Sequence, residues 1–422
     1  MISAADVAVE SEAVGGSSWG LLQDISAVAI SRLLPWEYSV RNLFRRPLRT
    51  MLTLVGLTTV LLLVLVVVGF IRGLESSLEV SGDPDTAIVF ALGMGENLEY
   101  SAIPRQVANL VPASVPGIGQ QYGRKYVSPE IYLGTEVTVG GRREPSLGLI
   151  RGVTTDVLMV RRGVQIEQGA WPKSREAQQP GEILVGTLAA TKLGVDPSEL
   201  SVGRQVQFEG RRWVVSGIFS AAGAAFESEV WCRQDELGVQ MRREDLSLVA
   251  MRFGRDGTFG DLQMFCSERK DLNLQAIRET DYYALLQRDY GPIRWLAWLV
   301  VGLVAGAGVF AGLNTMYASA MGRVREWAAL QTIGFSRGAL LLGLVQEGVL
   351  LASAATLLAT AIALIGLRSA AVRFTMGAFE LAVDGPSVLL VCGIGLAMGV
   401  VGAIPPGLRA LRKPIAEGLR AV

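Results

Sequence analysis

Four long stretches of apolar residues constrain this chain more than any other feature of its sequence. The first, Thr50–Ile71, reads TMLTLVGLTTVLLLVLVVVGFI and contains no charged residue. A helix needs about 20 such residues to cross the hydrocarbon core of a bilayer. Three later stretches meet the same requirement, so we expect membrane spans at residues 50–72, 292–322, 339–367 and 386–404. The sequence therefore predicts an α-helical membrane protein with four transmembrane helices.

The composition is consistent with a membrane protein and argues against several kinds of site. Of the 422 residues, 50% are hydrophobic and 18% are charged, against roughly 25% charged in soluble domains. Basic and acidic residues balance at 39 each, which gives no reason to expect nucleic acid as a partner. The chain has no histidine, which removes His-based metal sites and Ser-His or Cys-His nucleophile pairs. We therefore expect no catalytic residue, no metal site and no cofactor bound by this chain.

Basic residues gather on one side of the predicted spans. They precede the first span, occupy the connection at 323–338 and follow the fourth span: Arg41, Arg45, Arg46, Arg49, Arg323, Arg325, Arg337, Arg409, Arg412, Lys413 and Arg420. The positive-inside rule then places both termini and the 323–338 connection in the cytoplasm, and residues 73–291 outside. The first span starts too far along the chain and is too long for a signal peptide, so it is expected to be a retained anchor.

Residues 73–291 are expected to form a mixed α/β extracytoplasmic domain, inserted between the first two spans. Strand patterns occur at Ala87–Leu92, Glu130–Val139, Glu182–Val185, Gln205–Phe208 and Arg212–Phe219, and helical patterns at Pro104–Leu110, Thr187–Leu193 and Asp281–Tyr290. Turns are expected at Gly141, Gly181, Gly203 and Gly210. Cys232 and Cys266 lie in this domain, and their spacing alone does not decide whether they pair.

The remaining segments are expected to be short. Residues 1–49 form a cytoplasmic tail with an interfacial amphipathic helix over Leu21–Leu34, residues 368–385 form a short outer loop, and residues 405–422 form a cytoplasmic tail.

The connection at 323–338 is predicted to hold a short helix that ends at Gly334, with Ser336 placed to cap the next helix. Trp327, Leu330 and Ile333 share one face at helical spacing. Such a helix suits docking into a groove on a soluble partner, but the same face also suits resting on the membrane surface. The residues leave both readings open.

Two features inside the spans also have two readings. Glu347 lies in the third span, where a charge costs about 3 kcal/mol or more. It is either a transport or gating carboxylate or, as we prefer, a structural partner of Gln346, Arg323 or the backbone, or a side chain that snorkels to the inner interface. Glycines spaced four apart permit close helix packing within the chain or a dimer seam: Gly302, Gly306, Gly308, Gly312, Gly395 and Gly399.

Residues 314–337 resemble the signature of the FtsX/MacB-type permease superfamily. The matching positions are Asn314, Ser319, Arg323, Arg325, Glu326, Ala328, Leu330, Ile333 and Gly334, and the departures are Trp327, Gln331 and Thr332. The segments 42–50, 186–219 and 402–420 are similar to further parts of the same family, in the same order. The resemblance implies a MacB-like or LolC-like permease subunit without a fused ATPase domain.

That resemblance also implies partners and a mechanism. A separate ABC ATPase would bind ATP and Mg²⁺ and dock on the connection after the second span, with Arg323, Arg325, Glu326, Leu330, Ile333 and Gly334 in the coupling segment. This chain contains no G-x-x-x-x-G-K-S/T motif, so we expect it not to be an enzyme. A second permease subunit, giving a homodimer, and a periplasmic adaptor with an outer-membrane channel are the other partners implied.

The function implied is export or extraction of a substrate from the bacterial inner membrane or periplasm by MacB-like mechanotransmission. Two alternatives stay open: an FtsX-like regulator of a cell-wall hydrolase that moves no cargo, and a lipoprotein-releasing permease. A membrane-anchored enzyme is disfavoured because residues 73–291 contain no catalytic set.

Overall fold

The computed structural model describes residues 36–95, 97–140, 144–174, 179–366, 370–374 and 377–420. They divide into two compact units. The helical unit contains residues up to Val67, Trp298–Ile365 and residues from Val383 onward, and the outer unit contains Val68–Ala297 and Gly366–Ala382. The expected helix at Leu21–Leu34 and the expected turn at Gly141 lie outside the described residues.

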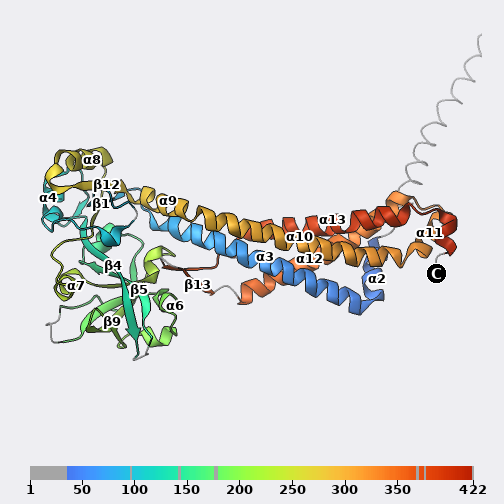
Figure 1. Cartoon of the computed structure of the whole chain (residues 1–422), viewed down its shortest axis with the longest axis horizontal. Coiled ribbons are helices and arrows are strands. Elements are labelled where there is room, and N and C mark those ends of the chain that lie inside the picture. The colour runs from blue at the N-terminus through green and yellow to red at the C-terminus, as the bar shows by residue number, and fades with distance from the viewer. Residues whose placement is uncertain are drawn as a thin grey trace, which may run out of the picture. The chain divides into compact units, whose positions relative to one another are not determined.

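Within the described ranges, four helices are long and apolar enough to cross a membrane (Figure 1). They are α3 (Pro47–Ser81), α10 (Gly291–Met321), α12 (Arg337–Gly366) and α13 (Gly385–Leu411). Two run well past the predicted spans: α3 continues nine residues beyond residue 72, and α13 continues through Pro405 and Pro406. Span prediction counts apolar residues, whereas a helix also continues through charged residues of high helix propensity such as Glu75 and Glu79.

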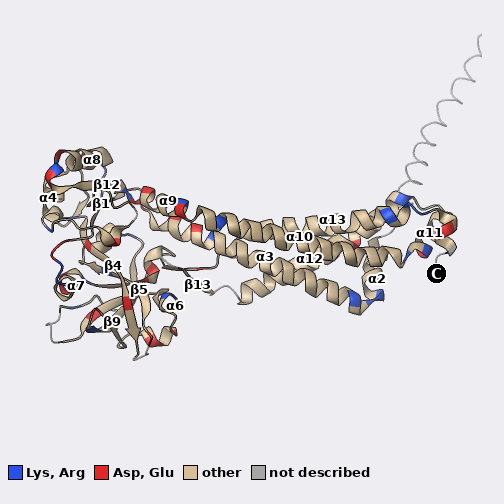
Figure 2. Ribbon diagram, in the orientation of Figure 1, with Lys and Arg blue, Asp and Glu red and all other residues tan. Residues whose placement is uncertain are grey.

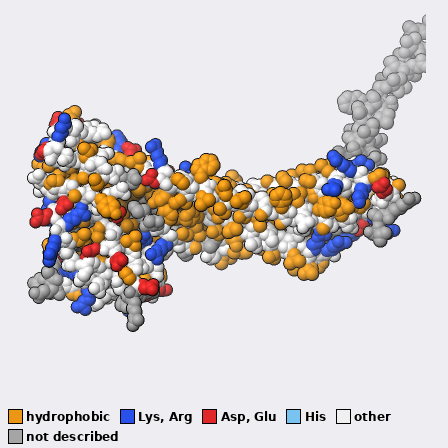
Figure 3. Space-filling model, viewed as in Figure 1, with side chains coloured by type: hydrophobic (Ala, Val, Ile, Leu, Met, Phe, Trp, Pro, Cys, Tyr) orange, Lys and Arg blue, Asp and Glu red, His pale blue; other side chains and the backbone are white. Residues whose placement is uncertain are grey.

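Among the described residues, the helical unit also contains three shorter helices: α2 (Trp36–Arg45), α11 (Val324–Ile333) and α14 (Ile415–Arg420). Pro47 starts α3 directly after α2, at the helix position where a missing N–H is tolerated. The segment predicted as a cytoplasmic tail, 405–422, contains the last turns of α13 and all of α14. In Figure 2 the charged residues lie toward the helix ends, and in Figure 3 apolar side chains cover the visible face of the long helices.

The outer unit is built on a sheet of ten strands within the described residues. Its order is β12-β1-β11-β4-β5-β10-β7-β9-β6, with β8 paired to β4 and β9. The strands are β1 (Thr86–Ala91), β4 (Val127–Val139), β5 (Ser146–Val153), β6 (Gln165–Gly169), β7 (Gly181–Gly186), β8 (Gln205–Phe208), β9 (Arg211–Ser220), β10 (Glu229–Arg233), β11 (Leu248–Arg252) and β12 (Leu274–Arg278). The long strand β4 joins the two halves, because its first residues pair with β11 and its later residues with β5 and β8.

Both faces of this sheet are covered. Successive residues of β1 alternate between two hydrophobic clusters, with Ala87 and Val89 in one and Ile88 and Phe90 in the other. The helices of the outer unit are α4 (Val107–Ser114), α5 (Val157–Val160), α6 (Ala189–Leu193), α7 (Gln234–Met241), α8 (Phe259–Glu268) and α9 (Glu279–Asp289). A mixed α/β domain thus follows α3 in the chain and precedes α10.

Several elements of the outer unit differ from the sequence prediction. Gly181 is the first residue of β7 rather than a turn, and the helix expected at Pro104–Leu110 begins only at Val107. Strand β5 was not predicted. A Cβ at Gly148 would lie 2.5 Å from Val137 Cγ2, so the glycine is required for packing against β4. The loop predicted at 368–385 contains a hairpin of β13 (Ala371–Phe374) and β14 (Gly377–Glu380).

Candidate functional site

The connection between α10 and α12 forms the predicted short helix. Helix α11 starts after Arg323 and ends at Gly334, whose φ of +111° is the left-handed conformation that glycine adopts most readily. The Gly334 and Phe335 amides donate to the carbonyl oxygens of Gln331 and Leu330. Ser336 Oγ then accepts a hydrogen bond from the Ala339 amide at 3.2 Å, which caps the start of α12 as expected.

The two faces of α11 have different environments. Val324, Trp327 and Ala328 are buried, and α11 packs against α14. A Cβ at Gly418 of α14 would lie 2.9 Å from the Ala328 Cβ, so the two helices approach closely. The predicted common face of Trp327, Leu330 and Ile333 is therefore wrong: Trp327 is 3% exposed, whereas Ile333 is 76% exposed.

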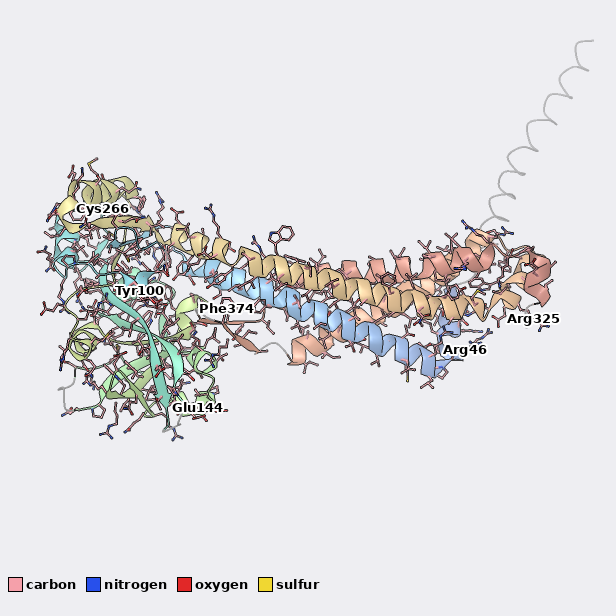
Figure 4. The ribbon with its side chains drawn as sticks, in the orientation of Figure 1. Arg46, Tyr100, Glu144, Cys266, Arg325 and Phe374 are labelled. Atoms are coloured by element: carbon pink, nitrogen blue, oxygen red, sulfur yellow. The ribbon has the colours of Figure 1, made fainter. Side chains whose placement is uncertain are left out.

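The opposite face of α11 is open. It consists of exposed residues at helical spacing: Arg325, Glu326, Ala329, Thr332 and Ile333. We call these five residues the free face of α11. Arg325 and Arg46 are labelled in Figure 4 at the same end of the helical unit. The free face combines both signs of charge with one large apolar side chain, Ile333.

A buried ion pair lies at the start of α11. Arg323 Nη1 and Nη2 donate to Glu347 Oε2 and Oε1, each at 2.8 Å. Asn42 Nδ2 of α2 donates to the same carboxylate at 3.1 Å, and Arg323 Nη2 also donates to Ser319 Oγ at 2.6 Å. Ser39 Oγ of α2 donates to the Gly343 carbonyl oxygen of α12 at 3.1 Å. Helix α2, the start of α11 and α12 therefore meet at one carboxylate, and we call this cluster the Glu347 junction.

The Glu347 junction accounts for several sequence features. Arg323 was one of the partners expected for Glu347, and that contact is present; the functional role of Glu347 stays a prediction. Ser319 and Arg323 of the resemblance motif contact each other. Asn42 and Ser39 were not predicted to take part, because α2 lies about 300 residues from α12 in the chain and local patterns do not reveal that contact.

The glycines expected to pack helices fall into two groups. A Cβ at Gly308 would lie 2.3 Å from Met398 Cε, at Gly395 2.5 Å from Thr356 Oγ1, and at Gly399 2.8 Å from the Gly348 carbonyl oxygen. These three lie at close helix contacts. A Cβ at Gly302, Gly306 or Gly312 would meet no described atom within 4 Å, so none of these three needs to be glycine for packing within the chain. Their place in a dimer seam stays a prediction.

A second buried charge network holds α9 in the outer unit. Arg151 donates twice to Glu229 and once to Glu130, each at 2.6 Å, and Arg161 contacts both Glu130 and Glu279 of α9. Burial acts to raise the pKa of Glu130, but Arg161 and Arg151 outweigh it and the pKa is lowered. Breaking such a pair leaves an uncompensated buried charge and costs about 3–5 kcal/mol. The start of α9 is thus fixed to β4, β5 and β10.

The structure shows whether Cys232 and Cys266 pair and whether the described residues include a metal site. Cys232 and Cys266 are both buried free thiols, so the pairing left open by the sequence is not present. Burial raises the pKa of Cys266 to about 11, which keeps it a neutral thiol. Among the described residues, no group of three or more Cys, Asp or Glu side chains is placed to hold a metal ion.

Comparison with protein families agrees with this architecture. A family model described as MacB-like periplasmic core domain matches residues 50–257, and one described as FtsX-like permease C-terminal matches residues 298–415. The chain belongs to the FtsX/MacB-type ABC permeases. The second match contains α11 and Glu347, so the free face and the ion pair lie in the permease domain itself.

Two solved structures have similarity to about half of the chain. The periplasmic region of MacB from Actinobacillus actinomycetemcomitans has 14% identity and a TM-score of 0.37, covering 49% of this chain and 94% of that one. The extracellular domain of the noncanonic ABC-type transporter YknZ from Gram-positive bacteria has 14% identity and a TM-score of 0.33, covering 46% and 99%. Comparison with curated proteins finds no match. The assignment rests on the two family models.

Membership of this family has three direct consequences. The permease is a transmembrane transport component with an extracellular MacB-like α/β domain. Members of the family are transport components rather than enzymes. An ABC permease also works with an ATPase partner.

Proposed function

We propose that this permease transmits the movement of a separate ABC ATPase to its outer domain, and so exports or extracts a periplasmic or membrane-borne substrate. The observation that carries the proposal is the Glu347 junction, because it ties the start of α11 to both α2 and α12. A force that the ATPase applies to the free face of α11 would move α2, α11 and α12 together. It would not only bend the connection between α10 and α12.

The ATPase contact is assigned to the free face. Glu326 and Arg325 supply the charges, and Ile333 supplies an apolar contact that is 76% exposed in this chain. Leu330 lies within α11 and Gly334 ends the helix. Arg323 links the start of the helix to the Glu347 junction. Trp327 does not contact the ATPase in this account, because it is buried on the side of α11 that packs against α14.

Two continuous helices provide the outward route. The chain passes from the helical unit to the outer unit inside α3, after Val67, and returns inside α10, after Ala297. In the outer unit, Arg294 Nη1 donates to Glu75 Oε1 at 3.0 Å, joining the two helices. The buried pair of Glu279 and Arg161 then fixes α9, which directly precedes α10, to the sheet. Glu347 is given a structural role in this route.

The orientation follows from the basic residues near α2, α11 and α14. We place the permease in the bacterial inner membrane, with both termini and α11 in the cytoplasm and the outer unit in the periplasm. ATP and Mg²⁺ are bound by the ATPase, and this chain performs no hydrolysis. A homodimer is supported by Gly302 and Gly306 of α10, where an added Cβ would meet no described atom within 4 Å. A periplasmic adaptor and an outer-membrane channel complete the proposed assembly.

Export is the function we propose, and the test distinguishes it from regulation and from lipoprotein release. The test is purification of the tagged permease in mild detergent, with its partners identified by mass spectrometry. An ABC ATPase together with a periplasmic adaptor is the expected result. An ATPase with a peptidoglycan hydrolase would instead establish the FtsX-like regulator, an ATPase with a lipoprotein carrier would favour lipoprotein release, and the absence of any ATPase after crosslinking would overturn the mechanism.

A further inference from the structure

A large basic cavity lies at one end of the sheet in the outer unit. The pairing of β1 places Arg252 of β11 opposite Thr86 and Arg278 of β12 opposite Ala87, so the two arginines flank the start of β1. The cavity there has a volume of about 570 Å³. That volume lies within the range of roughly 300–1,000 Å³ found for small-molecule sites. The labels β1, β12 and α8 in Figure 1 mark this region.

Four arginines but only one carboxylate line the cavity. The arginines are Arg162, Arg252, Arg255 and Arg278, and the carboxylate is Asp85. Asp85 is already engaged, since it accepts a hydrogen bond from Arg162 at 3.1 Å. Among the described residues, no carboxylate lies within ion-pair distance of the other three arginines, although the more distant Asp83 acts on Arg252 through its charge. The cavity therefore carries an excess of positive charge.

Arg252 is the buried cation of this cavity. It is 8% exposed, its guanidinium lies 4.1 Å from the centre of the Tyr126 ring, and its buried Nε has no hydrogen-bond partner among the described residues. Burial, together with the charge of Arg162, lowers the pKa of Arg252. The guanidinium of Arg252 therefore lies against the Tyr126 ring at the wall of the cavity.

Aromatic rings line the rest of the cavity, and backbone hydrogen bonds fix the segment that carries them. Tyr126, Phe253 and Phe259 contribute rings, and Arg278 lies over the Phe259 ring at 5.1 Å. The Gly254 amide donates to the Gly117 carbonyl oxygen at 2.8 Å, and the Phe253 amide to the Asp85 carbonyl oxygen at 2.8 Å. The cavity is thus preformed, and its rings can cover an apolar part of a ligand next to the charged group.

We propose that this cavity binds a phosphate-type oxyanion, carried either by a free phosphate compound or by an anionic lipid headgroup. Guanidinium groups match the oxygens of phosphate in geometry and charge, and the excess of positive charge in the cavity attracts an anion. Arg252 is the buried anchor, and Arg255 and Arg278 close over the ligand from the exposed rim. The inference does not depend on which ATPase or adaptor the permease binds.

The test uses the full chain in phosphatidylcholine nanodiscs, titrated by calorimetry with pyrophosphate and, separately, with monomeric short-chain phosphatidylglycerol. We expect saturable binding of at least one probe. Arg252→Gln should weaken it about tenfold or more, because it removes a hydrogen bond from a charged donor. Arg278→Gln and Arg255→Gln should weaken it as well, and both positions are exposed and compatible with folding. Arg204→Gln, an exposed arginine of the same unit outside the cavity, is the matched control and should leave binding unchanged.

The two probes distinguish the source of the phosphate. Tighter binding of pyrophosphate indicates a free phosphate compound, and tighter binding of phosphatidylglycerol indicates a lipid headgroup. The proposal is overturned if neither probe binds saturably, or if Arg204→Gln weakens binding as much as the cavity variants do.

Discussion

Arg323 and Glu347, which lie 24 residues apart in the chain, form a bidentate ion pair beneath α11 with both contacts at 2.8 Å. Their side chains are 13% and 7% exposed, so little water screens the interaction. Asn42 donates to the same carboxylate from α2. The two charges therefore compensate each other at the point where α11 begins, and this is the basis of the first prediction.

Removing one partner of this pair should destabilise the permease more than removing both. Arg323→Met or Glu347→Leu alone leaves one buried charge unpaired, which costs about 3–5 kcal/mol. The double variant removes both charges and should recover most of the loss in apparent Tm, measured in one detergent. A double variant no more stable than the single variants would show that the pair is not the source of the stability.

A second substitution at Glu347 distinguishes a structural role from a transport role. Glu347→Gln keeps an oxygen that can accept from Asn42 but loses the charge that balances Arg323. If Glu347 is structural, this variant should assemble with reduced thermal stability, and the assembled protein should still transport. Normal assembly and unchanged stability combined with loss of transport would favour the gating role instead.

Replacing Gly399 or Gly302 with valine should have different effects on the folded yield. Gly399→Val places a Cβ 2.8 Å from the Gly348 carbonyl oxygen, so α12 and α13 must move apart, and the folded yield should fall. A Cβ at Gly302 would meet no described atom within 4 Å, so Gly302→Val should leave the folded yield unchanged. If Gly302 lies in the proposed dimer seam, the Gly302→Val protein should be monomeric by native mass spectrometry. A Gly302→Val protein that remains a normal dimer would remove Gly302 from the seam.

The β13–β14 hairpin should be pH-sensitive through Lys192. Lys192 Nζ of α6 donates to the Phe374 carbonyl oxygen at 2.9 Å, and burial together with Arg373 lowers the pKa of Lys192 to about 8. The ordinary value is about 10.5. Between these values the unfolded chain binds more protons than the folded chain, so this residue's contribution to stability rises with pH from about 8 to 10.5 and is absent below pH 8.

The measurement compares the Tm of the wild type and Lys192→Met across this pH range. The wild type should gain Tm relative to the variant as the pH rises from 8 to 10, because only the wild type gains that contribution. Parallel pH profiles for the two proteins would contradict the assignment.

Local patterns identify much of the helical unit from the sequence. The four long helices stand out because each has a charge-free or nearly charge-free apolar run, and Gly334 and Ser336 mark a helix end and a helix start by their intrinsic preferences. Strand β8 was predicted with its observed bounds, because its alternating residues pack on one side only.

What the sequence does not reveal is which segments meet. Helical spacing placed Trp327 and Ile333 on one face, but only the structure shows that the C-terminal helix α14 packs against α11 and leaves Ile333 exposed. Arg161 and Glu279 of the outer network are 118 residues apart, and Asn42 and Glu347 are 305 apart. Such contacts depend on the tertiary fold, and no periodicity in the sequence encodes them.

The most direct test of coupling compares two carboxylates on neighbouring helices. Glu326 lies on the free face of α11, and Glu417 is an exposed carboxylate on α14. The measurement is the stimulation of the partner ATPase by the reconstituted permease carrying Glu326→Lys or Glu417→Lys, with equal membrane insertion verified for both. We predict that Glu326→Lys reduces stimulation about tenfold, the equivalent of about 1.4 kcal/mol, while Glu417→Lys leaves it near the wild-type level. Unchanged stimulation with Glu326→Lys, or an equal loss with Glu417→Lys, would contradict the assignment of the free face of α11 as the coupling surface.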